Sequence, residues 1–157
     1  VKFTMLSFRI VQEKDMMLLF QWANDPLVRQ AAFHTELISI EDHKKWFFSK
    51  LNNFGTNMFI LEEEQIPVGQ IRFDLEELEG VYYIDYSISE KYRGKGLGKK
   101  ILILGLKFHE SFNQEKLIYR AFVKKNNRAS VKCFADVGFT FCSETPDYMV
   151  FELDNRR

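Results

Sequence analysis

The sequence contains few of the residues that characterise non-globular chains. Its 157 residues include only 2 cysteines, 3 prolines and 8 glycines, which excludes a disulfide scaffold, a collagen-like repeat and a proline-rich disordered chain. Basic and acidic residues number 22 each, so the formal net charge is zero. No overall field then favours nucleic acid or a membrane surface as a partner. Any binding site for an anion must be local.

Long hydrophobic runs are also missing. The longest, residues 16–20 and 101–106, are far shorter than the roughly 20 residues that a membrane-spanning helix needs. Residues 1–8 lack the basic start and apolar core of a secretory signal, and Cys133 and Cys142 suit reduced thiols. We therefore expect a cytoplasmic protein without a membrane or nucleic-acid partner, as a monomer or homodimer.

Hydrophobic residues make up 46% of the chain, and 16 of them are phenylalanine. A chain of this length buries roughly 70% of the surface that its unfolded form exposes. We therefore expect a single domain over residues 1–157. Most of the aromatic residues are expected in its core, and some are candidates for lining a pocket.

The periodicity of apolar residues predicts a mixed α/β fold. Alternating runs predict strands, and spacings of three to four residues predict helices. The expected strands are 6–11, 57–61, 66–75, 81–88, 117–123, 139–143 and 148–153, and the expected helices are 12–23, 39–52, 97–112 and 127–136. Asn24-Asp25-Pro26 is expected to form a turn that ends the first helix. Short connections make the middle strands an antiparallel meander, whereas the helix that follows them requires parallel pairing with the next strand.

A glycine-rich basic loop lies between the third strand of this meander and the next helix. It reads Arg93-Gly94-Lys95-Gly96-Leu97-Gly98-Lys99, and residues 91–107 contain six basic residues and no acid. Glycines let backbone N–H groups approach a phosphate, and a helix N-terminus adds unpaired donors and a favourable dipole. The loop therefore predicts a phosphate or pyrophosphate site.

The glycine spacing excludes two common phosphate loops. A P-loop needs Ser or Thr after its lysine, but Lys99 is followed by Lys100. A dinucleotide fingerprint needs Gly-x-Gly-x-x-Gly, and neither glycine pair here has the third glycine in place. The alternative of a merely solvated turn is disfavoured because three glycines are a costly way to build one.

The spacing that does fit is Arg93-x-x-Gly96-x-Gly98, which resembles the acetyl-coenzyme A signature of the GCN5-related N-acetyltransferase (GNAT) superfamily. Downstream, Asn127-x-x-Ser130-x-x-x-Phe134-x-x-x-Gly138-Phe139 resembles the next motif of that family. The resemblance implies a mostly antiparallel sheet of about six to seven strands, splayed between the fourth and fifth and flanked by about four helices. It also implies acetyl-CoA as cosubstrate, no metal, and direct transfer to a primary amine. The implied cofactor-binding residues are Ile88, Arg93, Gly94, Lys95, Gly96, Leu97, Gly98, Lys99, Asn127 and Ser130.

Direct acetyl transfer needs a neutral amine, a donor for the oxyanion and a proton for the leaving thiolate. The resemblance implies that the backbone N–H near Ile88 is the oxyanion donor, which a β-bulge would expose. Asp85, an acid within an aromatic strand, is the candidate base; the alternative is a hydrogen-bonded or solvated strand residue. Many relatives have Tyr where this chain has Phe134. Tyr119 is therefore the candidate proton donor, with Tyr148 and water as alternatives.

The N-terminal helices carry the information on the acceptor. Trp22-x-Asn24-Asp25-Pro26-x-x-Arg29 and the later His43-x-x-Trp46 resemble the pattern of bacterial acetyltransferases that modify nucleotide-linked amino sugars. The pattern also overlaps with acetylases of ribosomal-protein N-termini. The candidate substrate-binding residues are Trp22, Arg29, His43 and Trp46.

Other interpretations of the acceptor site are open. The tryptophans can equally be core anchors, with Arg29 paired to an acid. Acidic turns at 62–64 and 74–79 suggest a polyamine or lysine acceptor, although charged hairpin tips are usually just solvated. A noncatalytic module that binds coenzyme A is the alternative from a different class.

Overall fold

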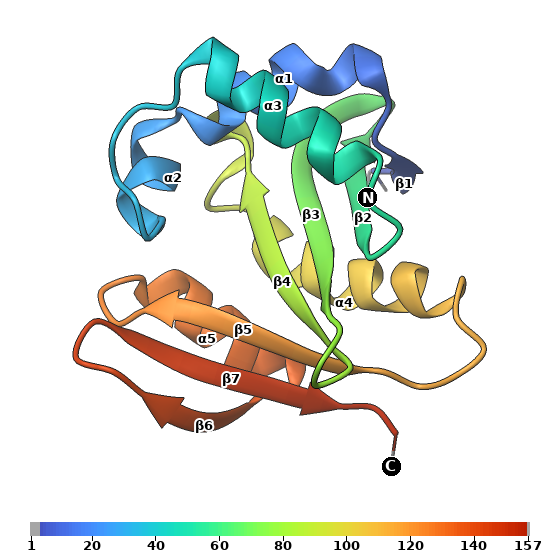
Figure 1. Ribbon diagram of the computed structural model, residues 1–157, viewed down its shortest axis with the longest axis vertical. Helices are drawn as coiled ribbons and strands as arrows, with labels where there is room; N and C mark the ends of the chain where they lie inside the picture. Colours follow the sequence, from blue (N-terminus) through green and yellow to red (C-terminus); the bar gives the residue numbers. More distant parts are fainter. Residues whose placement is uncertain (1–3, 157) are drawn as a thin grey trace.

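The computed structural model describes residues 4–156, and within them the chain forms one seven-stranded sheet with the order β1-β2-β3-β4-β5-β7-β6 (Figure 1). The strands are β1 (Leu6–Ile10), β2 (Thr56–Glu63), β3 (Ile66–Glu76), β4 (Val81–Ile88), β5 (Ile118–Lys124), β6 (Thr140–Glu144) and β7 (Tyr148–Asp154). The helices are α1 (Met16–Ala23), α2 (Pro26–Ala31), α3 (Ile40–Leu51), α4 (Leu97–Glu110) and α5 (Arg128–Val137), with 3-10 turns η1 (Glu13–Asp15) and η2 (Glu90–Tyr92). The predicted α/β fold with a mixed, mostly antiparallel sheet is confirmed.

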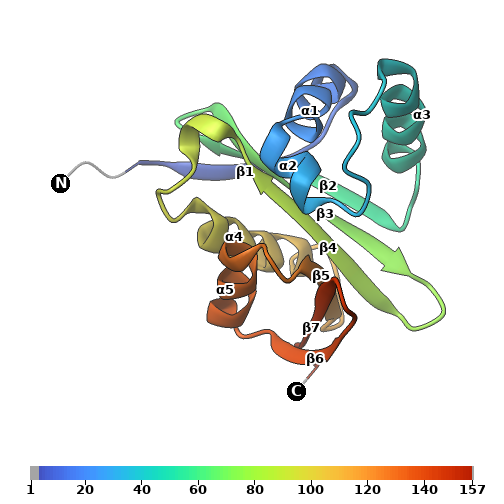
Figure 2. The same cartoon turned by 90° about the vertical axis from the view of Figure 1, so that its left-hand side faces the viewer.

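Helices cover both faces of the sheet. Helices α1, α2 and α3 lie on one side, and α4 and α5 lie on the other (Figure 2). The larger core packs α4 and α5 against the sheet and includes Phe73, Ile101 and Phe134; the smaller core packs α1 and α3 against β2 around Phe47. Helices α1, α3, α4 and α5 therefore use apolar residues for packing, whereas α2 has no buried residue.

The predicted turn ends the first helix as expected, since α1 stops at Ala23 and Asn24-Asp25 form the turn, but a second helix that was not predicted begins at Pro26. The Asp25 carboxylate accepts hydrogen bonds from the backbone N–H groups of Leu27 and Val28 and so caps α2. Pro26 occupies the first helical position, where its missing N–H costs nothing. Helix α3 begins as predicted, with the Ser39 hydroxyl accepting from the Asp42 N–H at 3.1 Å.

The sheet splays open where it was expected to. Strands β4 and β5 run parallel and pair only over Val81–Tyr83 and Ile118–Arg120, whereas β3 stays paired with β4 as far as Ile88. The register between β3 and β4 is regular over Gly69–Glu76 and Val81–Ile88, so this pairing contains no β-bulge. The gap instead arises because β4 turns away from β5 after Tyr83.

A buried histidine near the C-terminal end of α4 contacts residues of the sheet. The ring of His109 is fully buried and stacks on Phe73 with centroids 4.2 Å apart. The Asn57 amide nitrogen lies 3.2 Å from Nε2, and Nδ1 lies 3.0 Å from the Tyr119 hydroxyl. Asn57 donates to Nε2, which therefore carries no proton, and the neutral ring donates from Nδ1. Burial lowers the pKa of His109 to about 4.

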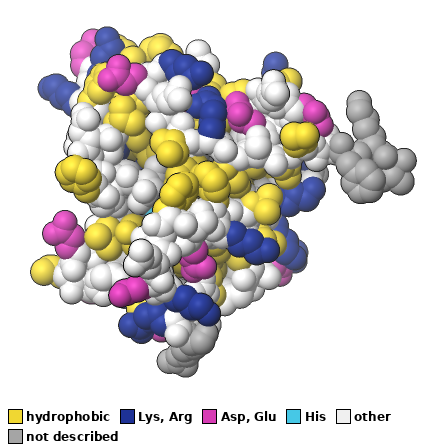
Figure 3. Space-filling model, turned by 90° about the vertical axis from the view of Figure 1, so that its right-hand side faces the viewer, with side chains coloured by type: hydrophobic (Ala, Val, Ile, Leu, Met, Phe, Trp, Pro, Cys, Tyr) yellow, Lys and Arg dark blue, Asp and Glu magenta, His cyan; other side chains and the backbone are white. Residues whose placement is uncertain are grey.

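The face seen in Figure 3 is opposite to the face seen in Figure 2. Hydrophobic side chains gather across its middle, with lysine and arginine side chains above and below them. A shallow groove of about 210 Å³ is lined by residues from β2, the C-terminal part of α3 and Phe112. Within residues 4–156, no helix is long and apolar enough to cross a membrane.

Candidate active site

A cavity of about 1000 Å³ lies where β4 and β5 diverge. Its walls come from α1, α2, the loop of residues 32–39, α3, β3, the C-terminal half of β4, and the turn before α5 with the first residues of that helix. Predicted site residues in these walls are Trp22, Arg29, His43, Trp46, Asp85, Ile88, Arg93, Asn127 and Ser130. The fold therefore brings residues from both predicted motif regions to one cavity.

The glycine-rich loop enters α4 beside this cavity. Gly94 and Gly96 have φ values of +75° and +79°, and a Cβ at either position would meet no atom within 4 Å. Both glycines are required by their left-handed backbone, and the space above them is open. Gly98 serves another purpose, since a Cβ there would lie 3.3 Å from the Cys133 Sγ. The exposed N–H groups at the start of α4 fit a pyrophosphate.

The side chains of this loop differ in their roles. Leu97 is buried in the core, so only its backbone is available to a ligand. Lys95 lies over the Tyr92 ring at 5.3 Å, and Lys99 is exposed. Residues 94–99 do not form the walls of the cavity itself. They lie at its edge, where the phosphates of a long cofactor would meet backbone N–H groups and lysines.

The backbone N–H of Ile88 points into the splay. The Ser89 N–H donates to the Val68 carbonyl at 2.8 Å, so Val68 and Ser89 are a hydrogen-bonded pair of the β3–β4 ladder. Hydrogen-bonded and non-hydrogen-bonded pairs alternate in an antiparallel ladder. The next pair, Gly69 and Ile88, is therefore non-hydrogen-bonded, and the N–H and C=O groups of Ile88 point away from β3. The Ile88 carbonyl accordingly accepts from Arg93 Nε at 2.9 Å on the side away from β3. The Ile88 N–H is thus available to an oxyanion even though no bulge is present.

Asp85 lies in the wall of the cavity on the side of the sheet that faces α3. Its side chain is 55% exposed, so the burial expected of a perturbed base is not found. One carboxylate oxygen accepts from Gln70 Nε2 at 3.0 Å and lies 3.7 Å from the Arg72 guanidinium. Arg72 is bound mainly to Asp74, at 2.7 Å. The carboxylate of Asp85 is therefore accessible to an amine in the cavity.

The structure corrects the choice of proton donor. Tyr119 is fully buried beside His109 and forms no part of the cavity wall, so it does not reach the site. Tyr148 packs against Phe122 and also lies outside these walls. Tyr86, which was not among the predicted site residues, lines the cavity.

Tyr86 projects from the opposite face of β4 to Asp85. Its hydroxyl lies 2.9 Å from the Ser130 Oγ, and its ring centroid lies 5.6 Å from that of Phe134. Burial raises the pKa of Tyr86, so its hydroxyl stays protonated. The signal available in the sequence was the alternation of the strand, which places a tyrosine on one face directly after an aspartate on the other.

Two of the predicted acceptor residues have structural partners. Arg29 donates to the backbone carbonyls of Ala23, His34 and Glu36, at 2.6, 2.9 and 3.4 Å, and does not pair with an acid. His43 is buried with Nε2 at 2.9 Å from the Met16 carbonyl, and burial lowers its pKa. The fixed Arg29 guanidinium is therefore a poor candidate for a phosphate ligand.

The two tryptophans contribute apolar surface to the cavity and also pack against the smaller core. The Arg72 guanidinium lies 5.1 Å from the ring centroid of Trp46. Trp22 and Trp46 thus act as core anchors and also line the cavity, and their role in binding the acceptor stays a prediction.

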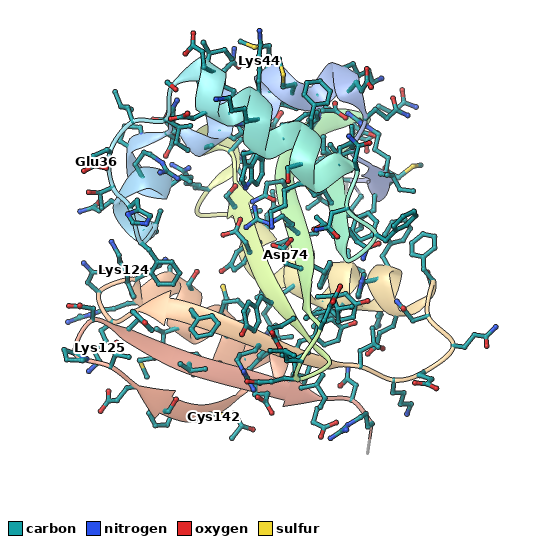
Figure 4. All side chains as sticks on the ribbon, in the orientation of Figure 1. Glu36, Lys44, Asp74, Lys124, Lys125 and Cys142 are labelled. Carbon is teal, nitrogen blue, oxygen red and sulfur yellow. The ribbon has the colours of Figure 1, made fainter. Side chains whose placement is uncertain are left out.

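Helix α2 is linked to the opposite wall of the splay. The Lys124 Nζ, at the end of β5, donates to the Gln30 carbonyl at 2.9 Å, and Figure 4 shows Lys124 directed towards the helix above it. Phe33 contacts Tyr148 and Phe122 edge-on, with centroids 5.2 and 6.5 Å apart. These contacts join α2 and the loop after it, whose residues line the cavity, to β5 and β7 on the other side of the splay.

No group of three or more metal-binding side chains occurs among residues 4–156.

Comparison with known proteins identifies the family. The acetyltransferase (GNAT) domain matches residues 6–140. Acetyltransferase PseH of Campylobacter jejuni is 26% identical over 145 residues, covering 90% of this chain and 87% of that protein. The uncharacterized N-acetyltransferase YfmK of Bacillus subtilis is 25% identical over 140 residues, covering 89% and 88%. The fold is shared with spermidine N-acetyltransferase from Vibrio cholerae in complex with CoA and spermine, with a TM-score of 0.83, 13% identity and 95% of each chain covered. This chain belongs to the GNAT family and is an acetyl-CoA-dependent N-acetyltransferase.

Proposed function

We propose that this enzyme acetylates the amino group of a small molecule, a nucleotide-linked amino sugar. The observation that carries the proposal is the link from α2 to β5, which joins the two sides of the splay beside a cavity with an accessible carboxylate in its wall. Trp22, Trp46 and Asp85 line the same cavity, and an aromatic face can stack a sugar ring beside a carboxylate that accepts a proton. The N-terminal sequence pattern supports the same class of acceptor.

The proposed mechanism gives each cavity group one role. Acetyl-CoA supplies the thioester, with its phosphates at the start of α4 and its acyl end in the splay. Asp85 accepts the proton of the attacking amine, and the Ile88 N–H donates to the oxyanion. Tyr86 donates a hydrogen bond to the sulfur as the carbon–sulfur bond breaks, because its hydroxyl stays protonated, and the thiolate then takes its proton from water. Ser130 orients that hydroxyl.

The phosphates of the acceptor are assigned to Arg128 in place of Arg29. Arg128 is exposed in the cavity wall, and no hydrogen bond or ion pair of its guanidinium is found among residues 4–156. The acidic turns give no support to a polyamine acceptor. Glu62 pairs with Arg9, Asp74 pairs with Lys50 and Arg72, Glu79 pairs with Arg120, and none of these acids lines the cavity.

An acceptor screen that measures free-thiol release from acetyl-CoA tests the proposal. Amino-sugar nucleotides, free amino sugars, aminoglycosides, polyamines and peptides are compared, and turnover is expected with the amino-sugar nucleotides. Arg128→Met should raise the acceptor KM about tenfold for the nucleotide-linked sugar and much less for the free sugar, with coenzyme A affinity unchanged. Turnover confined to peptides or polyamines would overturn the acceptor assignment and leave the enzyme class intact.

A further inference from the structure

The arginine of the cofactor motif is turned away from the glycine-rich loop. Arg93 donates from Nε to the Ile88 carbonyl and from Nη2 to the Asp25 Oδ1, both at 2.9 Å. The side chains of Arg93 and Asp25 are only 27% and 14% exposed. The pair joins residues 68 positions apart, and it connects the end of β4 to the start of α2.

Asp25 is held as firmly as Arg93. The oxygen that binds Arg93 also accepts the N–H groups of Leu27 and Val28, at 3.0 and 3.3 Å. Burial alone would raise the pKa of Asp25, but the hydrogen bond and charge of Arg93, with these N–H groups, lower it below its usual range. The carboxylate therefore stays charged and keeps both its cap and its arginine.

Helix α2 and the loop that follows it form one unit. Asn24 donates to and accepts from the backbone of Ile38, at 2.9 and 2.8 Å, and Arg29 binds the His34 and Glu36 carbonyls. The residues of this unit that line the cavity, His34 and Glu36 among them, are thus fixed relative to Asp25. A contact that fixes the position of Asp25 therefore also fixes the cavity wall formed by α2 and residues 32–38.

We propose that Arg93 is a positioning residue, which through Asp25 aligns the acceptor wall of the cavity with the oxyanion donor on β4, and that it does not bind the cofactor phosphates. Two of its donors are already engaged, and its charge is met by Asp25. Nε binds the carbonyl of Ile88, the same residue whose N–H points into the splay. The proposal rests on the proposed function for its catalytic meaning, but its structural part does not depend on the acceptor.

Two variants separate this role from phosphate binding. Asp25→Asn removes the charge and keeps an oxygen that caps α2, because Asn is as good a cap as Asp. Arg93→Met removes the guanidinium and keeps the apolar stem. Lys132→Met, which breaks an exposed ion pair with Asp136 on α5, is the matched control. Amide hydrogen exchange of residues 26–38 is measured by mass spectrometry, and coenzyme A affinity is measured by calorimetry.

Without ligand, each single variant should raise the exchange rate of residues 26–38 about fivefold. The double variant should raise it no further than either single variant, and Lys132→Met should leave it unchanged. Coenzyme A affinity should stay within about threefold of the parent. With an acceptor from the screen, the acceptor KM should rise more than tenfold in both.

Unchanged exchange in both variants would overturn the proposal. So would a tenfold loss of coenzyme A affinity in Arg93→Met that Asp25→Asn does not share, since that pattern marks a phosphate ligand. Hydrogen exchange and calorimetry need no acceptor, so they test the role of Arg93 even if the screen finds none. Failure of the proposed function is therefore distinguishable from failure of this inference.

Discussion

The buried ring of His109 should make the stability of this enzyme fall as the pH drops below neutral. The pKa of His109 is about 4 in the folded protein, against about 6.5 for an exposed histidine in the unfolded chain. A group whose folded pKa is depressed contributes stability that is present above the unfolded pKa and is lost as the pH falls towards the folded pKa. The window for His109 therefore runs from about pH 6.5 down to about pH 4.

The magnitude follows from the same two values. At 1.36 kcal/mol per pKa unit, the full effect is about 3.4 kcal/mol. Between pH 7.5 and 5.5 the loss is about 1.3 kcal/mol, and between pH 7.5 and 4.5 it is about 2.5 kcal/mol. These losses are a large share of the typical stability of about 5–15 kcal/mol.

The assay compares the parent with His109→Gln, which cannot titrate and retains an amide that can bond Tyr119 and Asn57. The free energy of unfolding is measured by urea titration at pH 7.5, 5.5 and 4.5. The difference between the two proteins should shrink by about 2.5 kcal/mol over this range. His43 and the paired carboxylates are present in both proteins, so their contributions to the pH dependence cancel in the difference. If the difference in unfolding free energy between the two proteins does not change with pH, the conclusion that His109 is buried as a neutral ring is refuted.

Three further predictions concern the active site. Gly96→Asp should weaken coenzyme A binding at least about tenfold in calorimetry, whereas Gly80→Asp, with a similar φ of +68° and open space around it, should bear the same strain and bind normally. Asp85→Asn should lower kcat by about 10²-fold with unchanged coenzyme A affinity; an unchanged kcat would remove Asp85 from the mechanism. Tyr86→Phe should lower kcat about tenfold or more, and adding Phe134→Tyr, whose ring is adjacent, should restore part of it; no loss of kcat would contradict the role of Tyr86.

The order of elements was predictable from sequence because each strand and long helix carries its own periodic apolar pattern. The glycine-rich loop was predictable because Gly94 and Gly96 adopt a backbone that other residues rarely adopt. Helix α2 was not, since its six residues are too few for a periodic signal and Asn-Asp-Pro is equally typical of a turn. Asn, Asp and Pro are favoured both in turns and at helix N-termini, so only the contacts made by residues 27–31 decide whether a helix follows.

The roles of single side chains depended on contacts that no local pattern contains. Arg29 was expected to bind a ligand, but three backbone carbonyls surround it. Tyr119 and Tyr86 both lie on strands beside the splay, and the difference between them is which neighbour each one faces. Strand alternation predicts which residues share a face, but not whether that face meets a helix or a cavity.

The brief pairing of β4 with β5 also bears on aggregation. Beyond Tyr83 and Arg120, two strand edges face a gap inside the sheet, where neither completes a ladder with the other. Exposed strand edges are templates for foreign strands, and natural proteins cover them with helices, loops or charge. Here the Lys124 contact with α2 and the aromatic contacts of Phe33 place a helix and a loop across the end of that gap. The helix and loop at this end of the gap thus cover edges that could otherwise pair with a second chain.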